Sequence, residues 1–123
     1  MQTSSFKLSG SDPRAVSIAR KVPNGARRTI KYTGRVYEPL WPSEGLWMAW
    51  YAVKKHTLAD AAEAADQYTK EILAHLDPAK VYVDLGEDAI LLCWEPPGKF
   101  CHRRVVAQWL EDALGITVPE RVV

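Results

Sequence analysis

The sequence lacks the features that mark membrane and secreted proteins. Nowhere do 18 apolar residues follow one another, so no segment is expected to cross a bilayer. The first residues, 1–5, are mostly polar and contain no apolar stretch of the kind that a signal peptide needs. We therefore expect a cytoplasmic protein without membrane contact, whose 2 cysteines remain reduced thiols.

Net charge is nearly absent as well. The chain carries +1 at pH 7, which gives no overall field to draw it onto nucleic acid. A charged partner would therefore have to meet a local patch. Aromatic residues crowd positions 32–51. We interpret them as one wall of a core, with a few lining a pocket, rather than as a stacking platform for single-stranded nucleic acid. Five basic residues crowd positions 21–35, just before and at the start of this stretch: Lys21, Arg27, Arg28, Lys31 and Arg35.

The composition that is present is ordinary for a globular domain, with 47% hydrophobic and 25% charged residues. A chain of 123 residues suits one domain rather than two. Residues 1–13 are rich in serine and end in an Asp-Pro pair, which predicts a flexible leader. The domain itself is then predicted over residues 14–123.

Helices are predicted by apolar spacing and by their caps. Thr57 is a good N-cap with Asp60 three residues later, and apolar residues then recur at intervals of three and four. Asp77 followed by proline, with Gly86 further on, predicts a short helix between them. The expected helices cover residues 44–54, 58–76, 78–85 and 100–114. The inward face of the last one is expected to consist of Val105, Val106, Trp109, Leu110 and Leu114.

One stretch, residues 89–94, is apolar at every position, as expected for a central strand that is covered on both faces. Other extended segments are predicted at 15–20, 30–32 and 36–40, and residues 116–118 are expected to form an edge strand. These elements predict an α/β fold: a small layered domain with a short, mostly parallel sheet flanked by helices.

Most of the reactive side chains fall between residues 93 and 104. Both cysteines, one of the 3 histidines, a carboxylate and three cations lie within these twelve residues. The predicted strand runs into this segment, a Pro-Pro-Gly turn bends it, and a helix leaves it. A strand end, a tight loop and a helix start are where α/β proteins bind ligands, so we predict the functional pocket here.

Of two functional interpretations of this segment, we adopt the first and keep the second as an alternative. In the first, the helix start binds a small anionic ligand, such as a nucleotide or a nucleic-acid phosphate. The ligand-binding residues would be Glu95, Lys99, Arg103 and Cys93. In the second, the chain is an enzyme in which Cys101, whose pKa is lowered at the helix start, is the nucleophile and His102 assists it. Consecutive helical side chains diverge by about 100°, so these two do not automatically form a dyad.

A structural interpretation is the third alternative. The same side chains would then form a buried polar network in which Arg103 neutralises Glu95, and a protein or nucleic acid would bind elsewhere. The Cys-x7-Cys-His spacing differs from that of zinc fingers, so neither a metal site nor a cofactor is predicted.

The segment also resembles a known family. An aliphatic run into Cys93-x-Glu95, followed by Cys101-His102-Arg103 at a helix start, is similar to the DUF488 family, as is the end of the chain at 118–120. Weaker matches lie at 17–19, 40–42 and Tyr68. The resemblance implies a compact α/β fold and carries these five motif residues over to this chain, but it implies no established activity.

Overall fold

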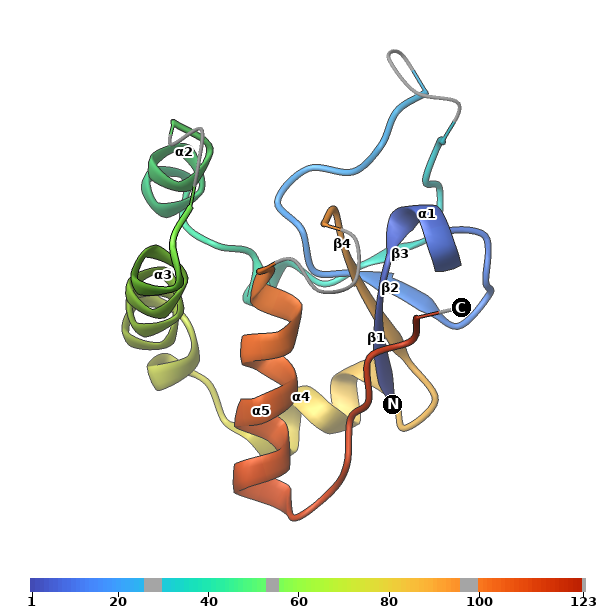
Figure 1. Cartoon of the computed structure of the whole chain (residues 1–123). Helices are drawn as coiled ribbons and strands as arrows, with labels where there is room; N and C mark the ends of the chain where they lie inside the picture. The colour runs from blue at the N-terminus through green and yellow to red at the C-terminus, as the bar shows by residue number, and fades with distance from the viewer. Residues whose placement is uncertain (26–29, 53–55, 96–99, 123) are drawn as a thin grey trace.

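The protein is built around a parallel sheet. Its computed structural model describes residues 1–25, 30–52, 56–95 and 100–122. Four strands in this described part pair in the order β1-β4-β2-β3, and all three pairings are parallel (Figure 1). The strands are β1 (Gln2–Ser5), β2 (Ala15–Ser17), β3 (Arg35–Val36) and β4 (Ile90–Cys93).

The apolar strand β4 occupies the interior of the sheet, as its composition predicts. It pairs with β1 on one side and β2 on the other, and its four residues are all buried. Successive side chains point to opposite faces of a sheet. Leu91 accordingly packs into one core cluster, while Ile90 and Leu92 pack into a second cluster.

Helices lie on both faces of the sheet. The larger core cluster joins β2 and β4 to α3, α4 and α5, and the smaller one contains Phe6 of α1 (Figure 1). The fold is therefore a small α/β domain, as predicted. None of the helices among the described residues has both the length and the apolarity that a membrane crossing requires. The helices are α1 (Phe6–Ser9), α2 (Glu44–Ala52), α3 (Leu58–Glu71), α4 (Pro78–Leu85) and α5 (His102–Leu114), with 3₁₀ turns at Glu38–Leu40 and Leu73–His75.

The caps form as the sequence predicts. The Thr57 hydroxyl accepts a hydrogen bond from the Asp60 backbone N–H, and the Asp60 carboxylate accepts one from the Thr57 N–H. Asp77 caps α4, and Gly86 ends it at a φ of 95°, a conformation that glycine adopts readily. The predicted helix over 58–76 is shorter than expected, because it ends at residue 71 and continues as the second 3₁₀ turn.

The prediction of a flexible leader is wrong for residues 2–9. Residues 2–5 form β1, whose register pairs Thr3 with Leu91, and residues 6–9 form α1. The serines are buried because they find partners: the hydroxyls of Ser4 and Ser9 lie 2.7 Å apart. Composition alone suggested disorder, whereas the strand is held by hydrogen bonds to a segment almost ninety residues later in the chain.

The predicted edge strand at 116–118 is also wrong. Backbone groups there bond to side chains, since the Val118 N–H donates to Glu111 and the Val118 carbonyl accepts from Arg104. Just beyond, a single bridge joins Glu120 to Thr3. Residues 30–32 likewise make only one bridge, and of the stretch 36–40 only Val36 belongs to a strand.

The face of α5 that packs on the sheet is rotated slightly from the predicted one. Val106, Ala107 and Leu110 are fully buried, whereas Trp109 is only partly buried at the margin of the core. The buried side of this helix also contains a charged residue, Arg103.

Candidate functional site

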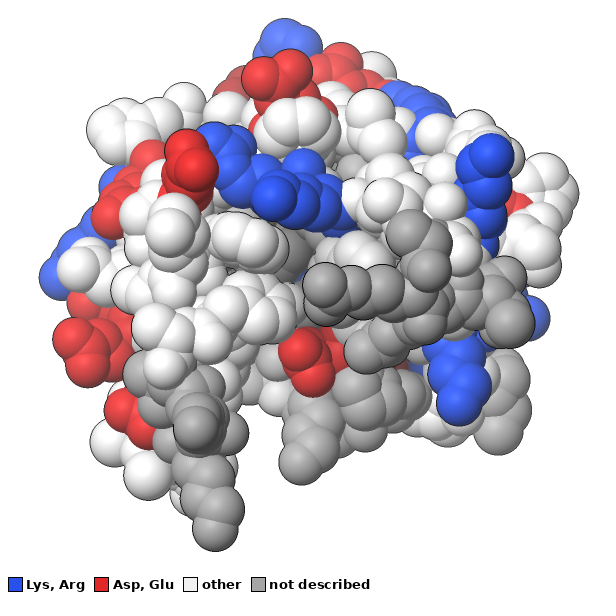
Figure 2. All heavy atoms as spheres, turned by 90° about the horizontal axis from the view of Figure 1, so that it is seen from above, with Lys and Arg blue, Asp and Glu red and all other residues white. Residues whose placement is uncertain are grey.

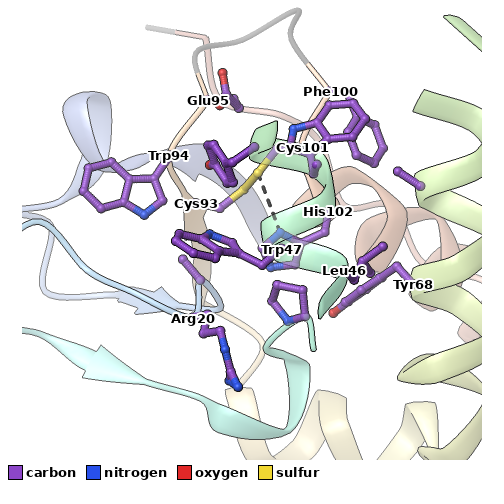
Figure 3. A pocket seen from close by; sticks show the side chains of 15 residues that line it. Arg20, Leu46, Trp47, Tyr68, Cys93, Trp94, Glu95, Phe100, Cys101 and His102 are labelled. Carbon is purple, nitrogen blue, oxygen red and sulfur yellow. Dashed lines mark hydrogen bonds between the residues drawn. A yellow bond between two sulfur atoms is a disulfide. The ribbon is translucent and has the colours of Figure 1, made fainter. Parts of the chain in front are cut away.

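A pocket lies where β2 and β4 end and α5 begins. The carboxyl ends of parallel strands meet at one edge of a sheet, and ligands of α/β proteins bind at this edge. Residues 19–20 after β2 and 93–95 at the end of β4 form one side of the pocket, and residues of α2 and α3 form the other (Figure 3). The cavity measures about 60 Å³. Aromatic rings make up much of the wall: Trp47, Trp50, Tyr51, Tyr68, Trp94 and Phe100.

The two cysteines meet at this pocket. Cys93, the last residue of β4, and Cys101, which directly precedes α5, are joined by a disulfide (Figure 3). The expectation of two free thiols is therefore wrong for this structure. Both residues line the pocket, but Cys93 is 1% exposed and Cys101 is 8% exposed. Cys101 is therefore the more accessible end of the bond.

His102 is held in one orientation next to Cys101. Its Nε2 lies 2.7 Å from the Ile18 carbonyl oxygen, which only accepts hydrogen bonds, so Nε2 carries the proton. The unprotonated Nδ1 then faces the Cys101 sulfur at 3.8 Å. Burial lowers the pKa of His102 to about 4. The positive charge of Arg103 also lowers this pKa, whereas the hydrogen bond to the Ile18 carbonyl raises it. The ring is therefore neutral at pH 7.

The contact between Cys101 and His102 differs from the sequence expectation for a physical reason. Cys101 has an extended backbone, with φ −150° and ψ 146°, because it is the N-cap residue and lies outside the helix. The divergence of consecutive helical side chains does not apply to it. The rings of Tyr68 and His102 pack in a T-shaped arrangement with 5.2 Å between their centroids.

Arg103 does not line the pocket with its neighbours. Its side chain is fully buried and forms a two-pronged ion pair with Glu120, through Nε to Oε1 at 3.0 Å and Nη2 to Oε2 at 2.7 Å. Its remaining terminal nitrogen, Nη1, donates to the Cys93 sulfur at 3.3 Å. Glu120 thus takes the place that the structural interpretation gave to Glu95, and the guanidinium contacts the disulfide from the protein interior.

Other predicted residues have different positions. Glu95 lines the pocket, on the opposite side of the sulfur pair from Arg20 in the view of Figure 3. Arg104 donates to the Thr3 hydroxyl and to the Val118 carbonyl oxygen, both at 2.8 Å, and so ties α5 to β1. Lys99 lies outside the described residues.

One pocket residue, Arg20, was not among the residues predicted from the sequence. Arg20 lines the pocket and makes no hydrogen bond or ion pair with any described residue. The signal for it was its place just after the strand at 15–17, because that strand end lies beside the end of β4. Trp47 and Trp50 of α2 both line the pocket, which agrees with the expectation that a few of the aromatic rings at 32–51 would do so. Trp50 is stacked on His56 with 3.5 Å between the ring centroids.

One face of the molecule has a surface of mixed charge. On the face shown in Figure 2, Lys and Arg side chains lie among Asp and Glu side chains and uncharged surface. This agrees with the formal net charge of +1. One of the cations lies beside the pocket, because the Lys21 ammonium is 5.0 Å from the centre of the ring of Trp47, which lines the pocket.

Comparison with known proteins identifies a family. A family model described as "Active DUF488-N3 subclade" matches residues 6–114. No curated protein and no solved structure matches the chain. The match spans the pocket residues that follow β2 and those from α2, β4 and α5, and it includes both cysteines and His102.

Proposed function

This chain belongs to the DUF488 family, in its DUF488-N3 subclade, and we propose that it is a cysteine-dependent enzyme of thiol–disulfide exchange. The observation that carries the proposal is the disulfide between Cys93 and Cys101 at the edge of an aromatic pocket. The description of the subclade as active agrees with a chemical role for this site. Cys101 is the sulfur that exchanges, and Cys93 is its partner.

The first step is the attack of a substrate thiolate on the Cys101 sulfur. A bond forms between the substrate sulfur and Cys101, the Cys93–Cys101 bond breaks, and its electron pair leaves on Cys93. Departure of a thiolate is faster when its charge is stabilised. Arg103 supplies this stabilisation, because its Nη1 already donates to Cys93 at 3.3 Å. A second thiolate then attacks the substrate sulfur and releases Cys101, so that two substrate thiols become one disulfide and the protein becomes a dithiol.

His102 orients the exchanging sulfur. In the reduced protein its neutral Nδ1 accepts a hydrogen bond from the Cys101 thiol, in the direction that the 3.8 Å contact already defines. The Ile18 carbonyl prevents the ring from presenting an N–H to the sulfur instead. Because burial lowers the pKa of His102 to about 4, the ring at pH 7 is an acceptor and not a proton donor.

The substrate is small, with an apolar part and a negative charge. The aromatic wall favours a flat or apolar group, and the cavity of about 60 Å³ has room for roughly four or five water molecules. Arg20 favours an anionic group, because it lines the pocket and has no partner among the described residues. This retains the small anionic ligand predicted from sequence, with Arg20 in the role that was expected of Arg103.

The test uses two single-cysteine variants in reduced form, Cys93→Ser and Cys101→Ser. Each is mixed with excess glutathione disulfide, and the mixed disulfide is followed by intact-protein mass spectrometry. The thiol left in Cys93→Ser should react at least about tenfold faster than the buried one left in Cys101→Ser, and also faster than a free small thiol at the same pH. Rates equal to that of the free thiol, or equal in both variants, contradict the proposal.

Two further variants and one control separate the roles of neighbouring residues. In the Cys93→Ser background, His102→Gln should slow the exchange, while His75→Gln, on the 3₁₀ turn, should leave it unchanged. Arg20→Gln should slow exchange with glutathione disulfide, which is anionic, more than with neutral 2-hydroxyethyl disulfide. Equal slowing with both probes would remove the role of Arg20 in substrate selection.

A further inference from the structure

We propose that, in the reduced protein, Cys93, Cys101 and His102 bind one borderline-soft divalent metal ion, of which Zn²⁺ is the type, on the inner side of the pocket. The two sulfurs and the imidazole nitrogen lie within 4.8 Å of one another and come from the end of β4 and the start of α5. Two thiolates and one imidazole are the donors that select Zn²⁺ over harder ions. From the sequence we predicted no metal site at these residues, because the Cys-x7-Cys-His spacing matches no zinc finger.

The distances fit a tetrahedral ion once the sulfurs separate. Zn–S bonds of about 2.3 Å and Zn–N bonds of about 2.0–2.1 Å place neighbouring ligands roughly 3.5–3.8 Å apart. The Cys101 sulfur and the His102 Nδ1 are already 3.8 Å apart. The Cα atoms of the cysteines are 6.9 Å apart, which leaves room for the two sulfurs to move from bonding distance to ligand distance.

The hydrogen-bond partners of His102 and Cys93 are arranged like the groups that hold the ligands of known metal sites. A metal-bound histidine usually donates its other ring N–H to a carbonyl or carboxylate, and this contact orients the ring. The Nε2–H of His102 makes such a bond to Ile18 at 2.7 Å, which leaves Nδ1 free to bind a metal. Arg103 donates to Cys93 and is itself held by Glu120, so the Cys93 thiolate has a fixed hydrogen-bond donor.

Metal binding depends on the redox state of the pair. A dithiol reductant transfers two electrons and two protons to the disulfide, which gives two thiols and leaves the reductant as a disulfide. The ion then binds both thiolates and releases their two protons to solvent. Three protein ligands leave one position of a tetrahedral ion for water or for a ligand in the pocket. The inference is independent of whether Cys101 exchanges with a substrate.

The test is a titration of the reduced whole protein with Co²⁺ in the absence of oxygen, after gel filtration removes the reductant. One equivalent of Co²⁺ should give sulfur-to-metal charge-transfer absorption and the strong visible bands of a tetrahedral site, and Zn²⁺ should abolish both. Cys93→Ser and Cys101→Ser should each weaken binding at least about 100-fold. His102→Gln should weaken it at least about tenfold, with His56→Gln and His75→Gln as matched controls.

The oxidised wild-type protein serves as a second comparison that needs no substitution and so no change in folding. After addition of Co²⁺, the oxidised protein should show no sulfur-to-metal charge-transfer absorption. The proposal is overturned if the reduced protein shows no such absorption, if the oxidised protein binds equally, or if His102→Gln binds as tightly as wild type. Exchange with glutathione disulfide in metal-free buffer tests the enzyme proposal separately, so failure of one leaves the other standing.

Discussion

Replacing Glu120 by glutamine should destabilise the fold far more than an ordinary surface substitution. Arg103 has no exposed side-chain surface, whereas the Glu120 side chain is 16% exposed. Glu120→Gln keeps the shape but leaves the guanidinium buried without a counter-charge. Removing one partner of a buried pair costs about 3–5 kcal/mol, and we expect the lower end, about 3 kcal/mol, because water reaches the carboxylate side.

Replacing Arg103, the other partner of the pair, should destabilise the fold less than replacing Glu120. Arg103→Met removes the buried charge and leaves Glu120 next to solvent, with the Thr3 hydroxyl still donating to it at 2.6 Å. We expect a loss of about 1.5–3 kcal/mol, the usual contribution of a hydrogen bond to a charged group. In the Arg103→Met background, Glu120→Gln should then cost less than about 1 kcal/mol, because no buried charge remains to be stranded.

Urea denaturation of the two single variants and the double variant measures these free energies of unfolding. Glu63→Gln, on the exposed side of α3, is the matched control and should change stability by less than about 0.5 kcal/mol. A cost of Glu120→Gln below about 1 kcal/mol, or the same cost in both backgrounds, would refute the buried-pair reasoning.

The same pair gives stability a dependence on acid. Burial raises the pKa of Glu120, but hydrogen bonds from Arg103 and Thr3 outweigh it, so the folded pKa lies below the usual 4.5. Because the pKa of Glu120 is lower in the folded state, the ionised carboxylate contributes its full stabilisation of the fold above pH 4.5. This stabilisation is lost as the pH falls through the folded pKa. Stability measured between pH 6 and about pH 3 should therefore fall less steeply in Glu120→Gln than in wild type.

Three further variants test the fold. Leu110→Ala should cost about 2–5 kcal/mol in urea denaturation, since Leu110 is fully buried, whereas Leu58→Ala, on the surface of α3, should cost less than about 0.5 kcal/mol. Similar losses of stability in Leu110→Ala and Leu58→Ala would mean that Leu110 is not on the buried face of α5. Thr57→Ala should cost about 1 kcal/mol through loss of the capping box, and no loss would show that α3 begins elsewhere. Gly86→Ala should cost about 1–3 kcal/mol from its φ of 95°, with no steric clash, and a neutral result would contradict that backbone conformation.

The sequence predicted best those elements that local signals define. The helix after Thr57, the short helix between Asp77 and Gly86, and the buried central strand each depend on caps or on apolar patterns within a few residues. These interactions are made inside the element or with any apolar neighbour, so the rest of the chain is not needed to predict them.

The N-terminal strand could not be predicted in this way. The segment 1–13 is short and mostly polar. Its strand β1 is held by pairing with β4 and by hydrogen bonds from the distant C-terminal segment, such as the one that the Arg121 N–H donates to the Thr3 carbonyl. A polar strand of this kind has no apolar alternation to reveal it. Residues 116–118 were predicted as a strand, but the C-terminal segment pairs with Thr3 further along the chain, at Glu120.

At the site, the sequence located the pocket but not the partners within it. Cys101 and His102 were identified as candidates, and the structure adds that Ile18, more than eighty residues earlier, defines the imidazole tautomer. Arg103 was assigned to a ligand because its partner, Glu120, lies on a segment whose path no local pattern reveals. Arg20 was missed because only the order of the strands brings it to the pocket.

The most direct test of thiol–disulfide exchange is to identify which sulfur of the disulfide a thiol attacks. The oxidised wild-type protein is mixed briefly with one equivalent of glutathione, quenched in acid, alkylated and mapped by peptide mass spectrometry. We expect glutathione on Cys101 and the alkyl label on Cys93, in at least about tenfold excess over the reverse pattern, because Arg103 stabilises the departing Cys93 thiolate. Equal labelling of both cysteines, or glutathione mainly on Cys93, would contradict it.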